Sequence, residues 1–119
     1  IMIIGGAVDR MTAEGMTQSA ADWTFDDDAY AALTDAMLSA DQVLMTHEHL
    51  DHIMAIARHP DPVALAPNLV LNESQIEALP MFAQGTLDPA LANLKSRLNG
   101  SVEAIAPGIV VVPAAGHTP

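Results

Sequence analysis

The residues best suited to metal binding or catalysis lie within one stretch of six positions: His47, His49, Asp51 and His52. Imidazole and carboxylate groups are ligands for zinc and other transition metals. Alternate side chains of an extended segment share a face, so His47 and His49 can reach one ion while Glu48 points away. Asp51 and His52 follow where the chain turns into a helix, and they can reach a neighbouring ion. The spacing predicts metal binding, with half of a binuclear centre in one segment.

Ordinary surface histidines are the alternative explanation of this cluster. Closely packed imidazoles repel one another when protonated and gain little when neutral unless something binds them, which favours metal. His59 is interpreted differently, because a single histidine beside Pro60 at a helix terminus is usually a surface or hydrogen-bonded residue. Glu48 is interpreted as a solvated side chain, and residues 26–28 as helix-capping aspartates rather than a calcium loop.

Composition narrows the classes of function. The chain has 119 residues, half of them hydrophobic, which suits a single domain over 1–119. Its formal charge of -11 argues against nucleic acid as a partner. Without cysteine, any metal must be held by histidine and carboxylate. No apolar run approaches the roughly 20 residues of a membrane span, and no signal peptide is evident. We expect a soluble protein with no membrane partner; its compartment is unknown, with the cytoplasm slightly favoured.

Hydrophobic patterns predict the elements that carry the cluster. Strands are predicted over 1–4 and 42–46, the second leading directly into the histidines. A helix is predicted over 26–39, and residues 7–24 between it and the first strand are expected to be irregular. Asp51 is expected to cap a second helix with Ile53, Ile56 and Ala57 on its apolar face. The cluster should therefore lie between a buried strand and a helix.

The later part of the chain has clearer stop signals. A short strand is predicted over 63–65, a helix from Asn72 to about residue 79, and a longer helix from Asp88 to a stop at Gly100. Residues 102–105 and 109–112 flank a Pro-Gly turn and predict a hairpin. This hairpin leads into the loop that contains the last histidine of the chain.

Two motifs in this order resemble the metallo-β-lactamase superfamily. Residues 47–52 resemble its His-x-His-x-Asp-His signature, and residues 116–118, Gly-His-Thr, are similar to the loop that supplies its next metal ligand. The resemblance implies a first metal bound by three histidines and a second bound by the remaining pair. These ligands are His47, His49 and His117 for the first metal, and Asp51 and His52 for the second.

The resemblance also implies a fold. The superfamily has an αββα sandwich, and this chain resembles its N-terminal half, an α/β (α+β) arrangement of a mixed β-sheet with flanking helices. We expect a fragment truncated at both ends, because the chain begins inside a strand and stops in a loop. In the family, a later aspartate and histidine complete the second site. The first site can therefore be complete within these residues, whereas the second needs residues beyond Pro119.

The function implied is a metallo-hydrolase. A metal held by three histidines lowers the pKa of bound water, and the resulting hydroxide would attack a small ester, lactone, thioester or lactam. Asp51 would serve as ligand and proton acceptor, and Zn²⁺, as one or two ions, is the expected cofactor, with iron or manganese as alternatives. An iron-dependent oxidoreductase of the same superfamily is the second hypothesis, although His49 stands where its flavin-linked branch typically has glutamate. A non-catalytic metal-binding fragment is the third, and homo-oligomerisation is left open.

Overall fold

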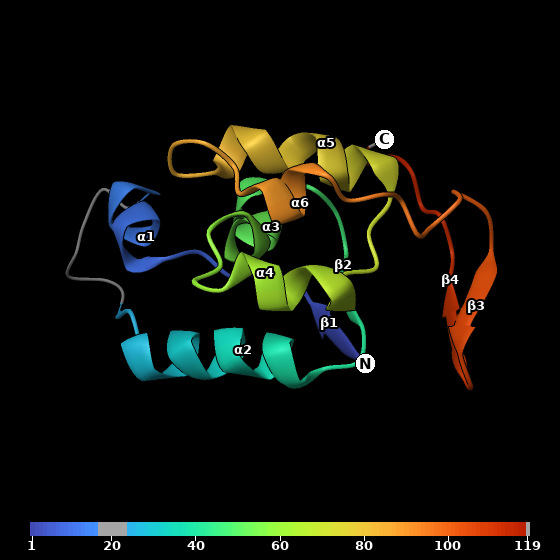
Figure 1. Ribbon diagram of the computed structural model, residues 1–119, viewed down its shortest axis with the longest axis horizontal. Helices are drawn as coiled ribbons and strands as arrows, with labels where there is room; N and C mark the ends of the chain where they lie inside the picture. The colour runs from blue at the N-terminus through green and yellow to red at the C-terminus, as the bar shows by residue number, and fades with distance from the viewer. Residues whose placement is uncertain (17–23, 119) are drawn as a thin grey trace.

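The protein combines helices with short strands (Figure 1). The computed structural model describes residues 1–16 and 24–118. This mixture of elements confirms the predicted α+β class. The described strands form two separate two-stranded sheets, one parallel and one antiparallel, instead of a single mixed sheet. The parallel sheet consists of β1 (Met2–Ile4) and β2 (Val43–Met45), and the antiparallel sheet of β3 (Glu103–Ala106) and β4 (Ile109–Val111).

The parallel sheet confirms the first two predicted strands. All three residues of β2 are buried. Val43 lies opposite Met2 of β1, and on its other side it forms a parallel bridge with Leu69. Strand β2 is therefore flanked on both sides by backbone. Helix α2 (Asp27–Ser39) also follows its prediction, because the Asp26 side chain caps it by accepting a hydrogen bond from the amide of Ala29 at 2.9 Å.

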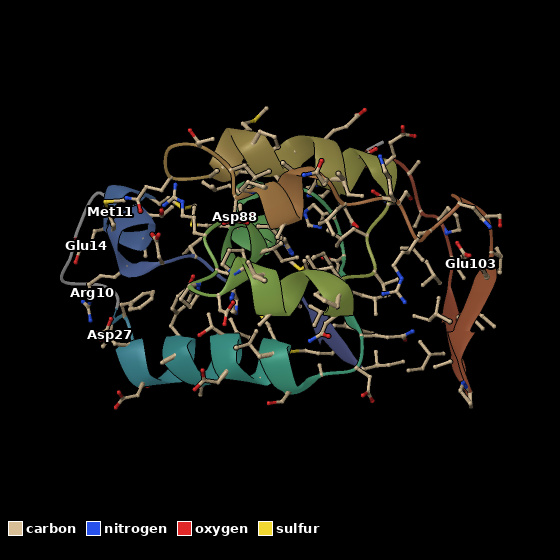
Figure 2. All side chains as sticks on the ribbon, in the orientation of Figure 1. Arg10, Met11, Glu14, Asp27, Asp88 and Glu103 are labelled. Carbon is tan, nitrogen blue, oxygen red and sulfur yellow. The ribbon has the colours of Figure 1, made fainter. Side chains whose placement is uncertain are left out.

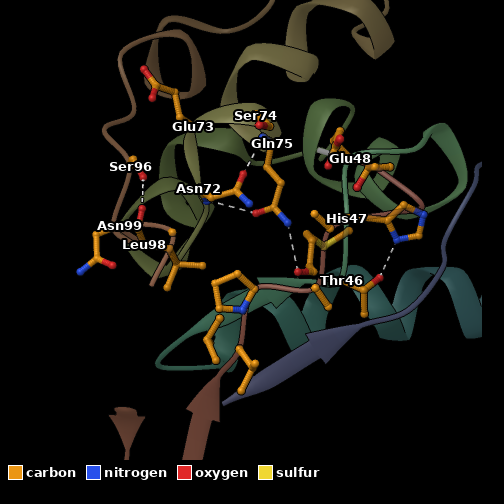
Figure 3. A pocket seen from close by; sticks show the side chains of 18 of the residues that line it. Thr46, His47, Glu48, Asn72, Glu73, Ser74, Gln75, Ser96, Leu98 and Asn99 are labelled. Carbon is orange, nitrogen blue, oxygen red and sulfur yellow. Dashed lines mark hydrogen bonds between the residues drawn. The ribbon is translucent and has the colours of Figure 1, made fainter. Parts of the chain in front are cut away.

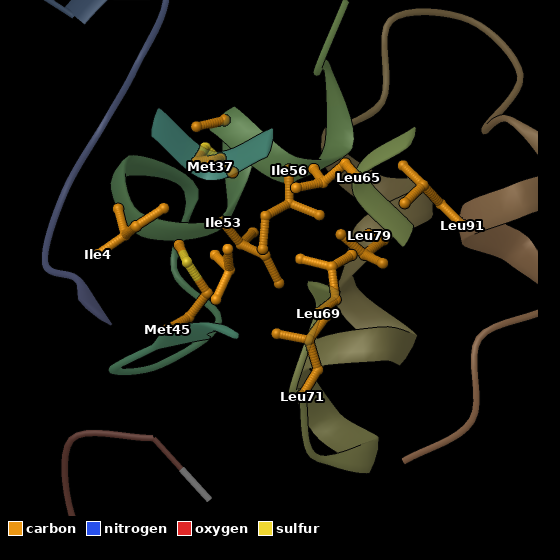
Figure 4. Close-up of a cluster of buried hydrophobic side chains, with 12 residues drawn as sticks. Ile4, Met37, Met45, Ile53, Ile56, Leu65, Leu69, Leu71, Leu79 and Leu91 are labelled. Atoms are coloured by element: carbon orange, nitrogen blue, oxygen red, sulfur yellow. The ribbon is translucent and has the colours of Figure 1, made fainter. Parts of the chain in front are cut away.

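The core lies between the parallel sheet and two helices that pack against each other, α3 (Leu50–Ala57) and α5 (Glu73–Phe82). The predicted apolar face of α3 is confirmed, since Ile53 and Ile56 are fully buried. Helix α5 begins after Asn72 as predicted and runs one turn further than expected. Figure 4 shows the buried side chains that meet here: Ile4, Met37, Met45, Ile53, Ile56, Leu65, Leu69, Leu71, Leu79 and Leu91.

The predicted hairpin is also confirmed. Strands β3 and β4 pair in antiparallel register around Pro107 and Gly108, and Gly108 has a φ of 78°, a conformation that side-chain-bearing residues rarely adopt. The hairpin lies at one end of the molecule, at the right of Figure 1. All its strand residues are exposed or half-buried. It therefore contributes little to the core.

The predicted strand over 63–65 is wrong, because these residues belong to the short helix α4 (Pro62–Leu65). The side chain of Asp61 accepts a hydrogen bond from the amide of Ala64 at 3.0 Å, and proline suits the first helical position because it lacks an N–H. A 3-10 turn, η1 (Ala66–Asn68), follows directly. The apolar residues 63–65 are therefore helical because the Asp61 cap and the proline start a helix there.

The long helix predicted from Asp88 to Gly100 is also wrong. Only α6 (Pro89–Ala92) forms. Beyond it, the amide of Arg97 donates to the carbonyl of Leu71 at 2.9 Å, and its Nη1 donates to the carbonyl of Leu69 at 3.1 Å. Because these bonds hold the segment along residues 69–71, tertiary contact overrides its helical periodicity.

The segment over 7–24, expected to be irregular, contains helix α1 (Arg10–Met16), while residues 17–23 lie outside the described part of the chain. No residue of α1 is buried. The helix is held by its start instead: Asp9 accepts a hydrogen bond from Arg58 Nη1 of the α3 C-cap at 2.9 Å. A helix attached through polar groups leaves little hydrophobic periodicity in the sequence.

Charged side chains also connect α1 to α2 at the surface. Figure 2 shows Arg10 beside Asp27, with which it forms an ion pair. Glu103 lies at the opposite end of the molecule, on the hairpin. The longest of the described helices, α2, has 13 residues. Within residues 1–16 and 24–118, none of the helices has the length and apolar character required to cross a bilayer.

Candidate metal centre

The histidine segment leaves the carboxyl end of the buried strand β2. The end of this strand is fixed by α5, because Gln75 Nε2 donates a hydrogen bond to the carbonyl of Met45 at 3.1 Å. Helix α3 then starts with His49 as its N-cap, so the predicted capping by Asp51 is wrong, and Asp51 lies in the first turn. Side chains at the carboxyl ends of parallel strands are well placed for a ligand site.

Three of the predicted ligands converge: His47, His49 and His117. Each ring offers one ring nitrogen as a possible ligand, and these three nitrogens all lie within 4.8 Å of one another. The centroid of the His117 ring is 4.8 Å from that of His47 and 4.6 Å from that of His49. These three side chains are close enough to bind one metal ion. The prediction that histidines from two distant segments lie close together is thus confirmed.

The third histidine reaches the group through the chain that follows β4. Gly116, directly before His117, has a φ of 138°, and its amide donates to the carbonyl of Thr118 at 3.1 Å. This backbone conformation is one that L residues rarely adopt, so the glycine of the Gly-His-Thr motif has a local structural reason. The tight turn presents the His117 ring to the other two.

The two ring nitrogens of His47 have different surroundings. Its Nδ1 lies 3.1 Å from the hydroxyl of Thr46, whereas its Nε2 is buried and finds no hydrogen-bond partner among the residues that the structure describes. Burial lowers the pKa of His47, and the nearby rings of His52, His117 and His49 lower it further. The neutral imidazole, which is the form that binds metal, is therefore favoured.

Asp51 and His52 lie beside the three-histidine group and are not members of it. The ring of His52 lies over that of His47, with centroids 3.8 Å apart. Its Nε2 is 3.4 Å from Asp51 Oδ2, and the Asp51 side chain is 56% exposed. The pair expected at a second metal is thus adjacent to the first site, with one carboxylate open to solvent.

An open cavity of about 840 Å³ borders two of the three grouped histidines (Figure 3). His47 and His117 form part of its wall, Asn72 and Gln75 approach from the start of α5, and Asn99 lies on the segment after α6. Volumes of roughly 300–1,000 Å³ are typical of small-molecule sites. The three-histidine group therefore lies at a space that a small molecule can enter.

Glu48 and His59 do not belong to the three-histidine group. Glu48 lines the cavity and lies outside the three-histidine group, which agrees with its interpretation as a non-ligand. His59 is buried: its Nε2 donates to the carbonyl of Thr34 at 3.1 Å, and its Nδ1 accepts from the amide of Asp61 at 3.0 Å. Both ring nitrogens are satisfied, so the hydrogen-bonded interpretation of His59 is confirmed and a surface position is excluded.

Two residues that support the site were missed by sequence reasoning. Thr46 contacts the rings of both His47 and His52. Gln75 forms a capping box with Asn72, a pattern that the sequence displays and that explains the start of α5. The pattern gives no sign that the same amide also reaches strand β2, because that contact depends on how α5 packs.

The chain thus combines a three-histidine group, a buried and unpartnered Nε2 of His47, and an adjoining cavity, all among its described residues. No family model, curated protein or solved structure matches the chain.

Proposed function

We propose that this chain carries the metal site of a metal-dependent hydrolase related to the metallo-β-lactamase superfamily. His47, His49 and His117 would hold one ion, with zinc as the expected metal. The supporting observation is that these rings converge from distant segments while the buried Nε2 of His47 lacks a partner. A buried polar atom without a partner is costly, and a metal ion would satisfy it. The donor set of three imidazoles is also one that catalytic zinc uses.

A zinc ion with three histidine ligands supplies an activated water molecule at neutral pH. The remaining chemistry belongs to the chain. The three rings would hold the ion beside the cavity that His47 and His117 line, and the lowered pKa of His47 keeps its ring neutral and able to bind. Asp51, with its exposed carboxylate beside His52, is the proposed proton acceptor.

We propose a small molecule with a hydrolysable acyl group as the substrate: an ester, lactone, thioester or lactam. The adjoining cavity has a volume suited to such molecules, and its wall mixes polar side chains such as Asn72 and Asn99 with apolar ones such as Val112. The formal charge of -11 disfavours polyanionic substrates. A second ion at Asp51 and His52 would require further ligands.

Metal binding and hydrolysis are tested on the purified chain, stripped with a chelator and reloaded with zinc. Elemental analysis is expected to give at least one ion per chain, and His117→Ala is expected to lose it. Glu48→Gln is the matched control, since Glu48 lies next to two ligands and outside the group. Hydrolysis of a small ester, lactone, thioester and lactam is then measured before and after chelation. Equal rates in both states would exclude metal-dependent hydrolysis.

The same three histidines also fit metal binding without catalysis, because they suffice to hold an ion. Tight zinc binding that depends on His117, combined with no hydrolysis of any of the four substrates, would favour this second function. Elemental analysis of protein purified without added metal distinguishes zinc from iron, and iron would favour the oxidoreductase hypothesis.

A further inference from the structure

The hydroxyl of Thr46 connects two histidine rings. Its Oγ1 lies 3.1 Å from Nδ1 of His47 and 3.0 Å from Nδ1 of His52. A hydroxyl has a single hydrogen to donate, and a neutral imidazole carries hydrogen on only one of its two nitrogens. Thr46 can therefore donate to no more than one of the two rings. If it donates to one ring, the other must carry its hydrogen on Nδ1 and donate to Thr46.

The far nitrogen of His47 shows what each arrangement would mean for the three-histidine site. If Thr46 donated to Nδ1 of His47, the hydrogen of that ring would reside on Nε2. This atom is buried and finds no partner in the described part of the chain, so neither a donor nor an acceptor is satisfied there without metal. Only the form with its hydrogen on Nδ1 leaves a lone pair on Nε2 for a metal ion.

The far nitrogen of His52 decides between the two arrangements. Its Nε2 lies 3.4 Å from Oδ2 of Asp51. A hydrogen on this nitrogen would attract the carboxylate, whereas a lone pair would repel it. His52 is therefore expected to carry its hydrogen on Nε2 and to accept from Thr46 through Nδ1. Thr46 then has no hydrogen left for His47, which is expected to donate from Nδ1 and to keep a lone pair on Nε2.

We propose that Thr46 is a positioning residue that sets the tautomers of both rings, by accepting from His47 Nδ1 and donating to His52 Nδ1. The lone pair of His47 Nε2 is then available to the three-histidine site. His52, in contrast, is held in the tautomer whose Nε2 is occupied by hydrogen. In the metal-free chain a lone pair thus faces the three-histidine site, while at the neighbouring pair the Nε2 hydrogen of His52 would have to leave before an ion could bind. This inference takes its metal ligands from the proposed function.

The tautomers are measured directly by long-range ¹H–¹⁵N correlation spectra of the metal-free protein at about pH 8, where histidines are mostly neutral. In the wild type, His47 is expected in the Nδ1–H form and His52 in the Nε2–H form. Thr46→Ser keeps the hydroxyl and should preserve both. Thr46→Val, similar in shape, should shift His47 toward a mixture of tautomers. A wild-type His47 mainly in the Nε2–H form overturns the proposal, as does a Thr46→Val spectrum identical to that of the wild type.

Zinc affinity, measured by chelator competition, gives the second readout. Thr46→Val is expected to bind about 10-fold more weakly, the lower end of the effect of removing a partner of a ligand, and Thr46→Ser should bind as the wild type does. An equal loss in Thr46→Ser would contradict the proposal. If Thr46→Val does not fold, the wild-type tautomers alone decide. The expected tautomers without zinc binding would end the proposed function and leave this inference standing, whereas zinc binding with reversed tautomers would do the opposite.

Discussion

The three-histidine group joins two regions with opposite packing. The first, here called the platform, comprises β2, α3 and the residues between them, and it supplies His47 and His49. Every residue of β2 is buried, and residues 53–56 of α3 have no exposed surface. The second is the hairpin with its following loop, which supplies His117. Its Val110 is 54% exposed and its Val112 is 62% exposed.

The difference separates stability from ligand placement. Elements with many buried contacts open only with most of the molecule, while exposed segments open at low cost. The platform should therefore determine the stability of the fold and hold two ligands in place. The hairpin should matter little for stability and greatly for metal affinity. Sites built on rigid elements are more precise than sites on loops, so His117 would be the least precisely placed of the three proposed ligands.

A core substitution in the platform gives the largest expected effect. Ile53→Ala removes a fully buried side chain and should lower the free energy of unfolding by about 2–5 kcal/mol. Val110→Ala on the hairpin removes an exposed one and should change it by less than about 0.5 kcal/mol. Denaturant unfolding of the two variants measures both. Equal losses would show that the hairpin is packed as firmly as the platform.

Zinc should act on the two regions unequally. At a free zinc concentration 100 times Kd, binding would stabilise the folded chain by about 2.7 kcal/mol. Because His117 connects the hairpin to the platform through the ion, amide hydrogen exchange should slow most in β3 and β4. Chelation should reverse the change, and His117→Ala should abolish it. Slowing confined to α3 would place the bound ion elsewhere.

The contact between α5 and the platform should have an intermediate effect. Gln75→Met keeps the length of the side chain and removes the donor to the buried carbonyl of Met45, so stability should fall by about 1–3 kcal/mol. Zinc affinity should fall as well, because the end of β2 is no longer fixed. Gln84→Met, at an exposed position, is the matched control. A loss of stability without a loss of affinity would show that Gln75 supports only the fold.

Lowering the pH should have the smallest effect on the free energy of unfolding, and His47 of the platform should cause it. Partial burial lowers the pKa of His47 below the usual 6.5, helped by the rings of His52, His117 and His49 and opposed by Asp51. The folded state then binds fewer protons than the unfolded state, so this stabilisation is present above pH 6.5 and is lost as pH falls through the lowered pKa. Unfolding of metal-free protein at several pH values should show this slope. In His47→Gln the slope should be smaller, and an unchanged slope would assign it to other groups.

Elements with local signals could be predicted from the sequence. Asp26 and Asn72 cap their helices through their own side chains, and the Pro-Gly turn defines the hairpin. The convergence of His47, His49 and His117 was likewise predicted, from the close spacing of the first two and from the resemblance of the Gly-His-Thr loop to a known motif. In each case, the residues that determine the structure lie close together in the sequence or belong to a recognisable motif.

Features that depend on packing could not be predicted in this way. The helix after Asp88 ends early because Arg97 bonds to the carbonyls of Leu69 and Leu71, which are distant in sequence. Helix α1 was missed because it is attached through the ion pair of Asp9 with Arg58. The contact of Gln75 with strand β2 belongs to the same class, since only the packed position of α5 creates it.

The parallel pairing of β1 with β2 also bears on when the chain could bind the proposed metal ion during synthesis. Helices α1 and α2 lie between the two strands in sequence, so their pairing must wait for a long segment to close. His47 and His49 are made together, whereas His117 is made much later. The nascent chain therefore offers an ion two nitrogens well before it offers the third. We expect weak, exchangeable metal uptake at first, and retention only once the hairpin has emerged and folded.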